Sequence, residues 1–233
     1  MDKNILSFVN KHYISFKLSN LILRVLSIFL ISYGAIAFVE ISSPFGYNSV
    51  NFFSNNVLPF TITLSCVAFL ISIVTICLYI IKSQWSFILM RAITNCYISV
   101  LFLIASFFRF NGYVFSYESN TIIIAKIIIY LLIIPIDLFI LIKWTIPKSR
   151  NHTSLGVKSL AGVLGVFVAR LLIQTRSISV QNLMPIIAFA IAVVLLVNSV
   201  YFSTQSYYAK KYSINTPADN SPPVPERTLH NLK

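Results

Sequence analysis

Six long runs of apolar residues, separated by short polar connections, constrain this chain more than any other feature. A helix of about 20 residues crosses the ~30 Å hydrocarbon core of a bilayer at ~1.5 Å per residue. Soluble domains carry ~25% charged residues, whereas this chain has 10% charged residues and a mean hydropathy of +0.82. The sequence therefore predicts an all-α polytopic membrane protein, a six-transmembrane-helix bundle with spans over residues 20–40, 57–81, 88–108, 121–143, 156–174 and 183–203.

The basic residues predict which way the bundle faces. With a cytoplasmic N-terminus, 14 of the 18 Lys and Arg residues lie at or near inner ends of spans, two lie at outer ends, and Lys126 and Arg170 lie within spans. Cytoplasmic loops of membrane proteins are enriched in Lys and Arg. Trp85 and Trp144 also fall at inner ends, where amphipathic rings favour the membrane interface. We therefore expect a bacterial inner-membrane protein with both termini in the cytoplasm.

Two segments lie outside the predicted spans. Residues 1–19 mix apolar and basic positions, so this leader is either a short amphipathic helix on the inner membrane surface or an unstructured arm. Residues 204–233 are polar and proline-rich, which is typical of an extended cytoplasmic tail. The transmembrane domain is expected to occupy residues 20–203 between them.

Several kinds of chemistry find no support in the sequence. The net charge of +12 does not predict nucleic-acid binding, because the basic residues flank apolar runs instead of forming one basic patch. The three histidines lie in the leader, a cytoplasmic loop and the tail, and no HExxH, CxxC or glycine-rich phosphate loop occurs. We expect no catalytic residues, no bound metal and no cofactor.

The fourth predicted span contains both a cation and an acid. Lys126 lies about five residues from its outer end, so its long side chain can reach the outer interface. Asp137 lies about six residues from the inner end, ~9 Å deep, and Pro135 predicts a loosened or kinked helix two residues before it. The sequence favours Arg24 or Arg91, at a similar depth, as the partner of Asp137. A proton or ion site, or access to water, are the alternatives.

The fifth predicted span carries a second embedded cation and a packing pattern. Arg170 lies near the outer end, where it is expected to reach the interface or to pair with an acid. Small residues recur on one face of this span, which favours close helix packing inside the bundle or between subunits. These small residues are Ala161, Gly162, Gly165 and Ala169.

These observations leave three functional hypotheses. The first is a non-enzymatic anchor, sensor, immunity or accessory subunit of a multi-protein system, with the cytoplasmic loops and tail as docking surface. An Asn-, Ile- and Ser-rich composition, typical of AT-rich genes, suggests a system of defence type. The second is a small oligomeric transporter or channel that uses Asp137. The third is a lipid- or glycan-processing membrane enzyme. Expected partners are membrane lipids, further copies of the chain, and a cytoplasmic or membrane protein.

Overall fold

The computed structural model describes Ile5, Phe8, Val9 and residues 18–41, 58–111, 114–146 and 180–212. Five helices in these ranges are long and apolar enough to cross a membrane. The predicted span over residues 156–174, with Arg170 and the small-residue face, lies outside the described residues. In chain order the elements are α2 (Leu18–Ile41), α3 (Leu58–Ile80), α4 (Gln84–Ala105), β1 (Phe108–Asn111), β2 (Val114–Tyr117), α5 (Asn120–Ile140), the π-helix η1 (Leu141–Thr145) and α7 (Val180–Lys211).

The predicted spans and the observed helices agree in position for these five runs and differ at their ends. Helix α4 begins at Gln84, four residues before the predicted start of its span. Helix α7 continues to Lys211, eight residues beyond the predicted end at residue 203. Thr204, Gln205 and Ser206 are buried within it. The predicted tail boundary at residue 204 therefore falls inside a packed helix.

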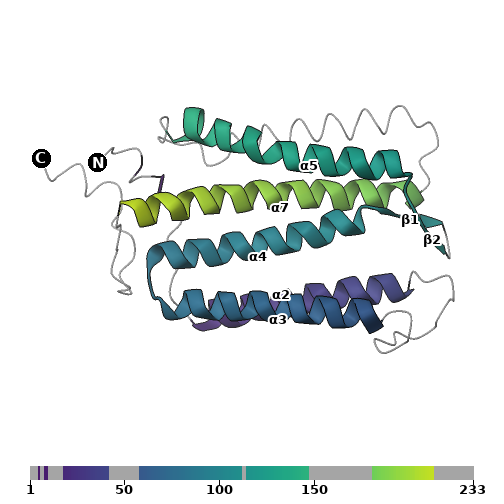
Figure 1. Ribbon diagram of the computed structural model, residues 1–233, viewed down its shortest axis with the longest axis horizontal. Helices are drawn as coiled ribbons and strands as arrows, with labels where there is room; N and C mark the ends of the chain where they lie inside the picture. The colour runs from purple at the N-terminus through teal and green to yellow at the C-terminus, as the bar shows by residue number, and fades with distance from the viewer. Residues whose placement is uncertain are drawn as a thin grey trace, which may run out of the picture.

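The helices lie side by side along the long axis of the molecule (Figure 1). In that view α5, α7 and α4 follow one another as layers, and α2 and α3 form the layer beyond α4. The contact between α4 and α7 is the most extensive one between described elements. Helix α4 is thus the central element, with α7 and α5 on one side and α2 and α3 on the other.

A tight turn reverses the chain between α3 and α4. Lys82 adopts a positive φ of 48°, a left-handed conformation that ends a helix and redirects the backbone. Ser83 then caps α4, because its side chain accepts a hydrogen bond from the Ser86 backbone N–H while the Ser86 hydroxyl reaches back to the Ser83 N–H. This reciprocal cap satisfies donors that a helix start leaves unpaired. The short connection makes α3 and α4 antiparallel neighbours.

At the opposite end of the bundle, a hairpin joins α4 to α5. Strands β1 and β2 pair antiparallel, with Phe108 opposite Tyr117 and Asn111 opposite Val114. The hydropathy pattern gave no signal for this hairpin, because the flanking helical runs dominate it. The hairpin matters for the site because it delivers Glu118 to the start of α5.

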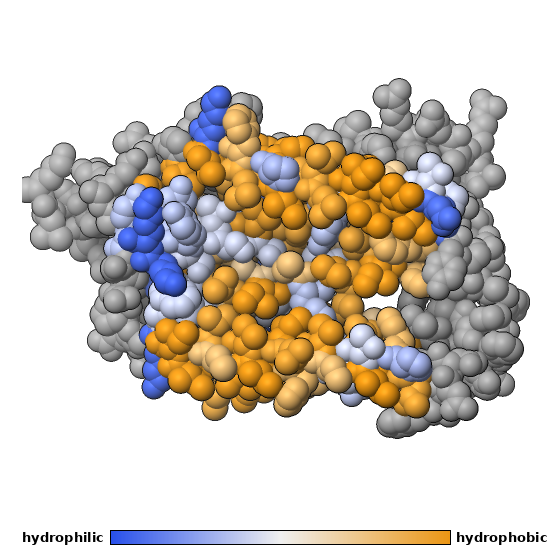
Figure 2. Space-filling view, viewed as in Figure 1, coloured by the Kyte–Doolittle hydropathy of each residue, from blue (hydrophilic) through white to orange (hydrophobic). Residues whose placement is uncertain are grey.

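The surface of the helical layers is apolar over most of its length. Large apolar side chains are exposed on the outer helices, including Leu30 of α2, Leu70 of α3 and Phe139 of α5. Figure 2 shows this apolar surface across the middle of one face, with hydrophilic residues toward the two ends. An apolar surface of this extent is costly in water and suits a lipid surrounding.

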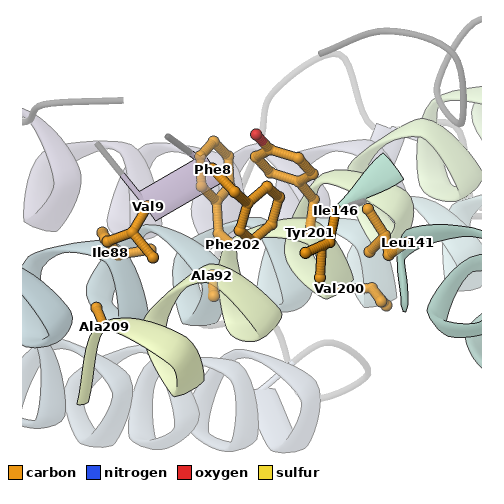
Figure 3. Close-up of a cluster of buried hydrophobic side chains, with 10 residues drawn as sticks. All are labelled: Phe8, Val9, Ile88, Ala92, Leu141, Ile146, Val200, Tyr201, Phe202 and Ala209. Carbon is orange, nitrogen blue, oxygen red and sulfur yellow. The ribbon is translucent and has the colours of Figure 1, made fainter. Parts of the chain in front are cut away.

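Part of the leader packs into the bundle. Phe8 and Val9 are helical and almost fully buried, in a cluster with Ile88 of α4 and Phe202 of α7 (Figure 3). The side-chain amide of Gln205 donates hydrogen bonds of 2.8 and 2.9 Å to the carbonyl oxygens of Phe8 and Val9. Phe8 and Val9 therefore form part of the core, and the two predicted alternatives for the leader as a whole stay predictions.

Candidate functional site: a buried carboxylate on α5

Helix α5 carries the charged residues that define the site. Lys126 lies near its start, at the end of the bundle that holds the hairpin, and Asp137 lies near its other end. Pro135 is between them, and its ring faces outward. Arg24 lies on α2 and Arg91 on α4, each in the second turn of its helix or soon after.

Lys126 is paired, and its partner was not predicted. Its ammonium group lies 2.6 Å from a carboxylate oxygen of Glu118, and the two side chains are 12% and 7% exposed. The same ammonium donates a hydrogen bond to the backbone carbonyl of Ser106, at the end of α4. The lysine therefore ties the start of α5 to the end of α4, which is a structural role.

Replacing Glu118 by Gln is expected to lower the free energy of unfolding by about 2 kcal/mol, because Lys126 then stays largely buried without its counter-charge. Thermal or denaturant unfolding of the detergent-solubilised protein measures this loss. In the double variant with Lys126→Gln, the loss should be smaller than the sum of the two single losses. Additive losses would show that the ion pair contributes nothing.

A short polar chain follows along the same helix. The Ser99 hydroxyl of α4 donates to the Ala192 carbonyl of α7 at 2.6 Å, and it lies 2.7 Å from the Tyr130 hydroxyl of α5. Because the single serine proton is used toward Ala192, Tyr130 donates to Ser99. These hydrogen bonds connect α4, α5 and α7 about one helical turn inward from Lys126. The Ser99 hydroxyl, the Tyr130 hydroxyl and the Ala192 carbonyl therefore each have a hydrogen-bond partner.

Asp137 is different because it is buried between apolar residues of its own helix face. It is 1% exposed and lies four residues from Ile133 and four from Leu141, on the same helix face. Ile133 belongs to an apolar cluster with Ala192 and Val193 of α7. Leu141 belongs to the cluster that contains Val200 and the leader (Figure 3). The carboxylate thus lies on the face of α5 toward α7, between two apolar clusters.

The predicted pairing of Asp137 with Arg24 or Arg91 is wrong. Both carboxylate oxygens are buried, and neither has a hydrogen-bond partner among the described residues. The Arg91 guanidinium instead lies over the Phe202 ring, 4.3 Å from its centroid. Arg91 therefore packs where α4 contacts α7, and Asp137 is on α5, which lies on the other side of α7 (Figure 1). Similar depth in the membrane did not bring the groups together, because the helices that carry them are in different layers.

The backbone is irregular on both sides of Asp137. Pro135 lacks an N–H, so the carbonyl of Leu131 loses its usual intrahelical donor, although α5 continues as a helix through the proline. After Asp137 the winding widens into η1, where the Ile146 N–H donates to the Leu141 carbonyl at 3.0 Å, five residues back. Single π-turns inside helices are frequent at functional sites. The wider winding follows Asp137, whereas the sequence predicts a distortion of the helix only at Pro135.

No protein-family model, no curated protein and no solved structure matches the chain.

Proposed function

We propose that this chain is a multi-pass membrane protein that binds a proton or a monovalent cation at Asp137 and passes it across the membrane, as a small oligomeric transporter or channel. The observation that carries the proposal is the burial of both carboxylate oxygens without a hydrogen-bond partner among the described residues. Ionisable residues within transmembrane segments are costly, and they mark ion pathways and proton relays.

A purely structural role for Asp137 has little support in these contacts. An acid that holds two helices together does so through a cation or a hydrogen-bond donor on the second helix. Lys126 and Tyr130 on the same helix show such contacts, whereas Asp137 shows none to the described elements. A neutral residue of similar shape would fill the space between Ile133 and Leu141 at lower cost. On this proposal the carboxyl group binds a ligand. For a short acidic side chain between apolar residues, that ligand is a proton or a small cation.

The irregular backbone supports the same proposal. Pro135 leaves the Leu131 carbonyl without its usual intrahelical donor, within two turns of Asp137. Unwound or interrupted helix segments supply carbonyl oxygens to cations in membrane transporters. Asp137 and this carbonyl oxygen are suitable ligands for a small cation, and the carboxyl group alone suits a proton.

The direct test is flux into liposomes that contain the purified protein. Gradients of H⁺, Na⁺ and K⁺ are imposed one at a time, with protein-free liposomes as the reference. The proposal expects at least one of these gradients to dissipate faster when the protein is present. Dissipation at the protein-free rate for all three cations would contradict it.

A second candidate function is supported by the end of α7. Helix α7 passes the predicted membrane boundary and presents exposed Tyr207, Lys210, Lys211 and Tyr212 beside Trp85. Tyr and Trp side chains are enriched at protein-binding surfaces. This surface suits the role of a non-enzymatic accessory subunit that docks a cytoplasmic or membrane partner, with the C-terminal tail adding to the contact.

The docking role predicts that a partner co-purifies with the full chain and is lost from a version that ends at Tyr212. The truncation must not be placed earlier, because Tyr208 and Ala209 pack against the leader and the core. Gentle extraction from native membranes followed by native mass spectrometry measures the association. A partner that remains bound to the truncated chain would exclude the tail as its docking site.

A further inference from the structure

Two arginines from neighbouring helices lie together in one half of the bundle. Leu21 of α2 packs against the cluster that contains Phe87 and Met90 of α4. Arg24 is one turn beyond Leu21, and Arg91 follows Met90 directly, so the packing brings the two guanidinium groups to the same level. They lie six and seven residues into their helices, ~9 and ~10 Å from the helix starts. The charge of Arg91 is close enough to act on Arg24.

No acid in the described residues balances this pair. Glu118 is paired with Lys126 at the opposite end of the bundle. Asp137 belongs to the α5–α7 interface. Glu40 follows Arg24 by 16 residues on α2, ~24 Å along the axis. Like charges held together in a partly buried site repel each other unless an anion joins them.

The two guanidinium groups have donors that are not used by the described protein. The Arg24 Nε–H is buried and has no hydrogen-bond partner among the described residues. The Phe202 ring covers the face of the Arg91 guanidinium, which leaves the N–H groups at its edge for an acceptor. Both groups are half-buried, so an anion that reaches them loses part of its water and binds more strongly than at an open surface.

We propose that Arg24 and Arg91 form a binding site for the phosphate group of an anionic membrane lipid. Forked guanidinium donors match the oxygen geometry of a phosphate. The site is about two turns from the helix starts, where the headgroup and glycerol region of the inner leaflet meets the protein if the predicted orientation holds. The exposed apolar side chain of Leu23, next to Arg24 on α2, offers a contact for an acyl chain of the same lipid. This site is separate from Asp137 and does not rest on the transport proposal.

The test compares lipid retention by the wild-type protein and variants in native mass spectrometry, with phosphatidylglycerol and phosphatidylcholine as probes. Wild type is expected to retain phosphatidylglycerol in preference to phosphatidylcholine. The double variant R24Q/R91Q is expected to bind phosphatidylglycerol more weakly than wild type, by a factor of about ten or more. The matched control K82N/K143Q also removes two positive charges from exposed positions at the same end of the bundle, and it should keep the wild-type preference.

Equal retention by R24Q/R91Q and wild type would overturn the proposal, and so would an equal loss in the control. If R24Q/R91Q does not give a monodisperse protein, the variants R24K/R91K, R24Q and R91Q replace it. Each is expected to lose part of the preference, and no loss in any of them contradicts the site. Inorganic phosphate is added to wild type as a separate arm. Stabilisation by inorganic phosphate equal to that by phosphatidylglycerol would assign the site to free phosphate and overturn the lipid assignment.

Discussion

Replacing Asp137 by Asn is expected to reduce cation flux to the level of protein-free liposomes while the protein still folds and assembles. The substitution keeps the shape of the side chain and removes only the charge and the site for the transported proton or cation. An amide between Ile133 and Leu141 is no more difficult to bury than an unpaired carboxyl group. Wild type and D137N are compared in the same liposomes at equal protein content, with size-exclusion chromatography as the check on assembly.

The matched control for this experiment is Glu118→Gln. Glu118 is the other buried acid that the structure describes, and it is paired with Lys126. The same chemical change at this position should lower stability but preserve flux per folded molecule. Flux by D137N at the wild-type rate would exclude Asp137 as the working group. A D137N protein that fails to assemble would assign the residue to structure instead.

Replacing Phe8 by Ala is expected to lower the free energy of unfolding by about 3 kcal/mol, because it leaves a cavity in a dense aromatic cluster. The Phe8 ring is 3% exposed and makes edge contacts with the rings of Tyr201 and Tyr208, with centroid distances of 5.2 and 6.5 Å. Figure 3 shows it directly beside Phe202. Its loss also loosens the leader that Gln205 holds.

The control for this prediction is Leu30→Ala on α2. The Leu30 side chain is 63% exposed and faces away from the bundle, so its truncation should change stability by less than about 0.5 kcal/mol. Denaturant unfolding in one detergent compares the two variants. Equal effects of F8A and L30A would show that the leader contributes nothing to the core.

Hydropathy alone was enough to locate the five described helices, because a helix that crosses lipid needs a long run of apolar side chains. It places α2, α3, α4 and α5 within a few residues of the observed ends. The end of α7 was misplaced because the residues that continue it, Gln205 and Ser206 among them, are polar. They are buried by hydrogen bonds to Phe8, Val9 and Trp85. A hydropathy pattern treats polar residues as exposed, so the helix end that it predicts is too early here.

The candidate site was predictable in its residues and unpredictable in its contacts. Asp137 and Pro135 stand out in an apolar run because charge and proline are rare there. Depth along a helix is readable from the sequence, but the neighbour at that depth depends on how the helices are arranged around one another. For this reason Arg91 was expected near Asp137 and is instead over Phe202. The Glu118–Lys126 pair was missed because it depends on the hairpin between α4 and α5.

The most direct test of the central claim is covalent labelling of Asp137 by an apolar carbodiimide in intact membrane vesicles. Such a reagent dissolves in lipid, and protonated carboxyl groups there add across its C=N bond. Peptide mass spectrometry then locates the adduct, with the paired Glu118 as the internal reference. We expect Asp137 to be labelled, D137N to stay unlabelled at this position, and the transported cation or an opposing pH gradient to slow the reaction. An Asp137 that stays unlabelled, or whose labelling rate no cation and no pH gradient changes, would contradict the claim that this carboxyl group is a cation site.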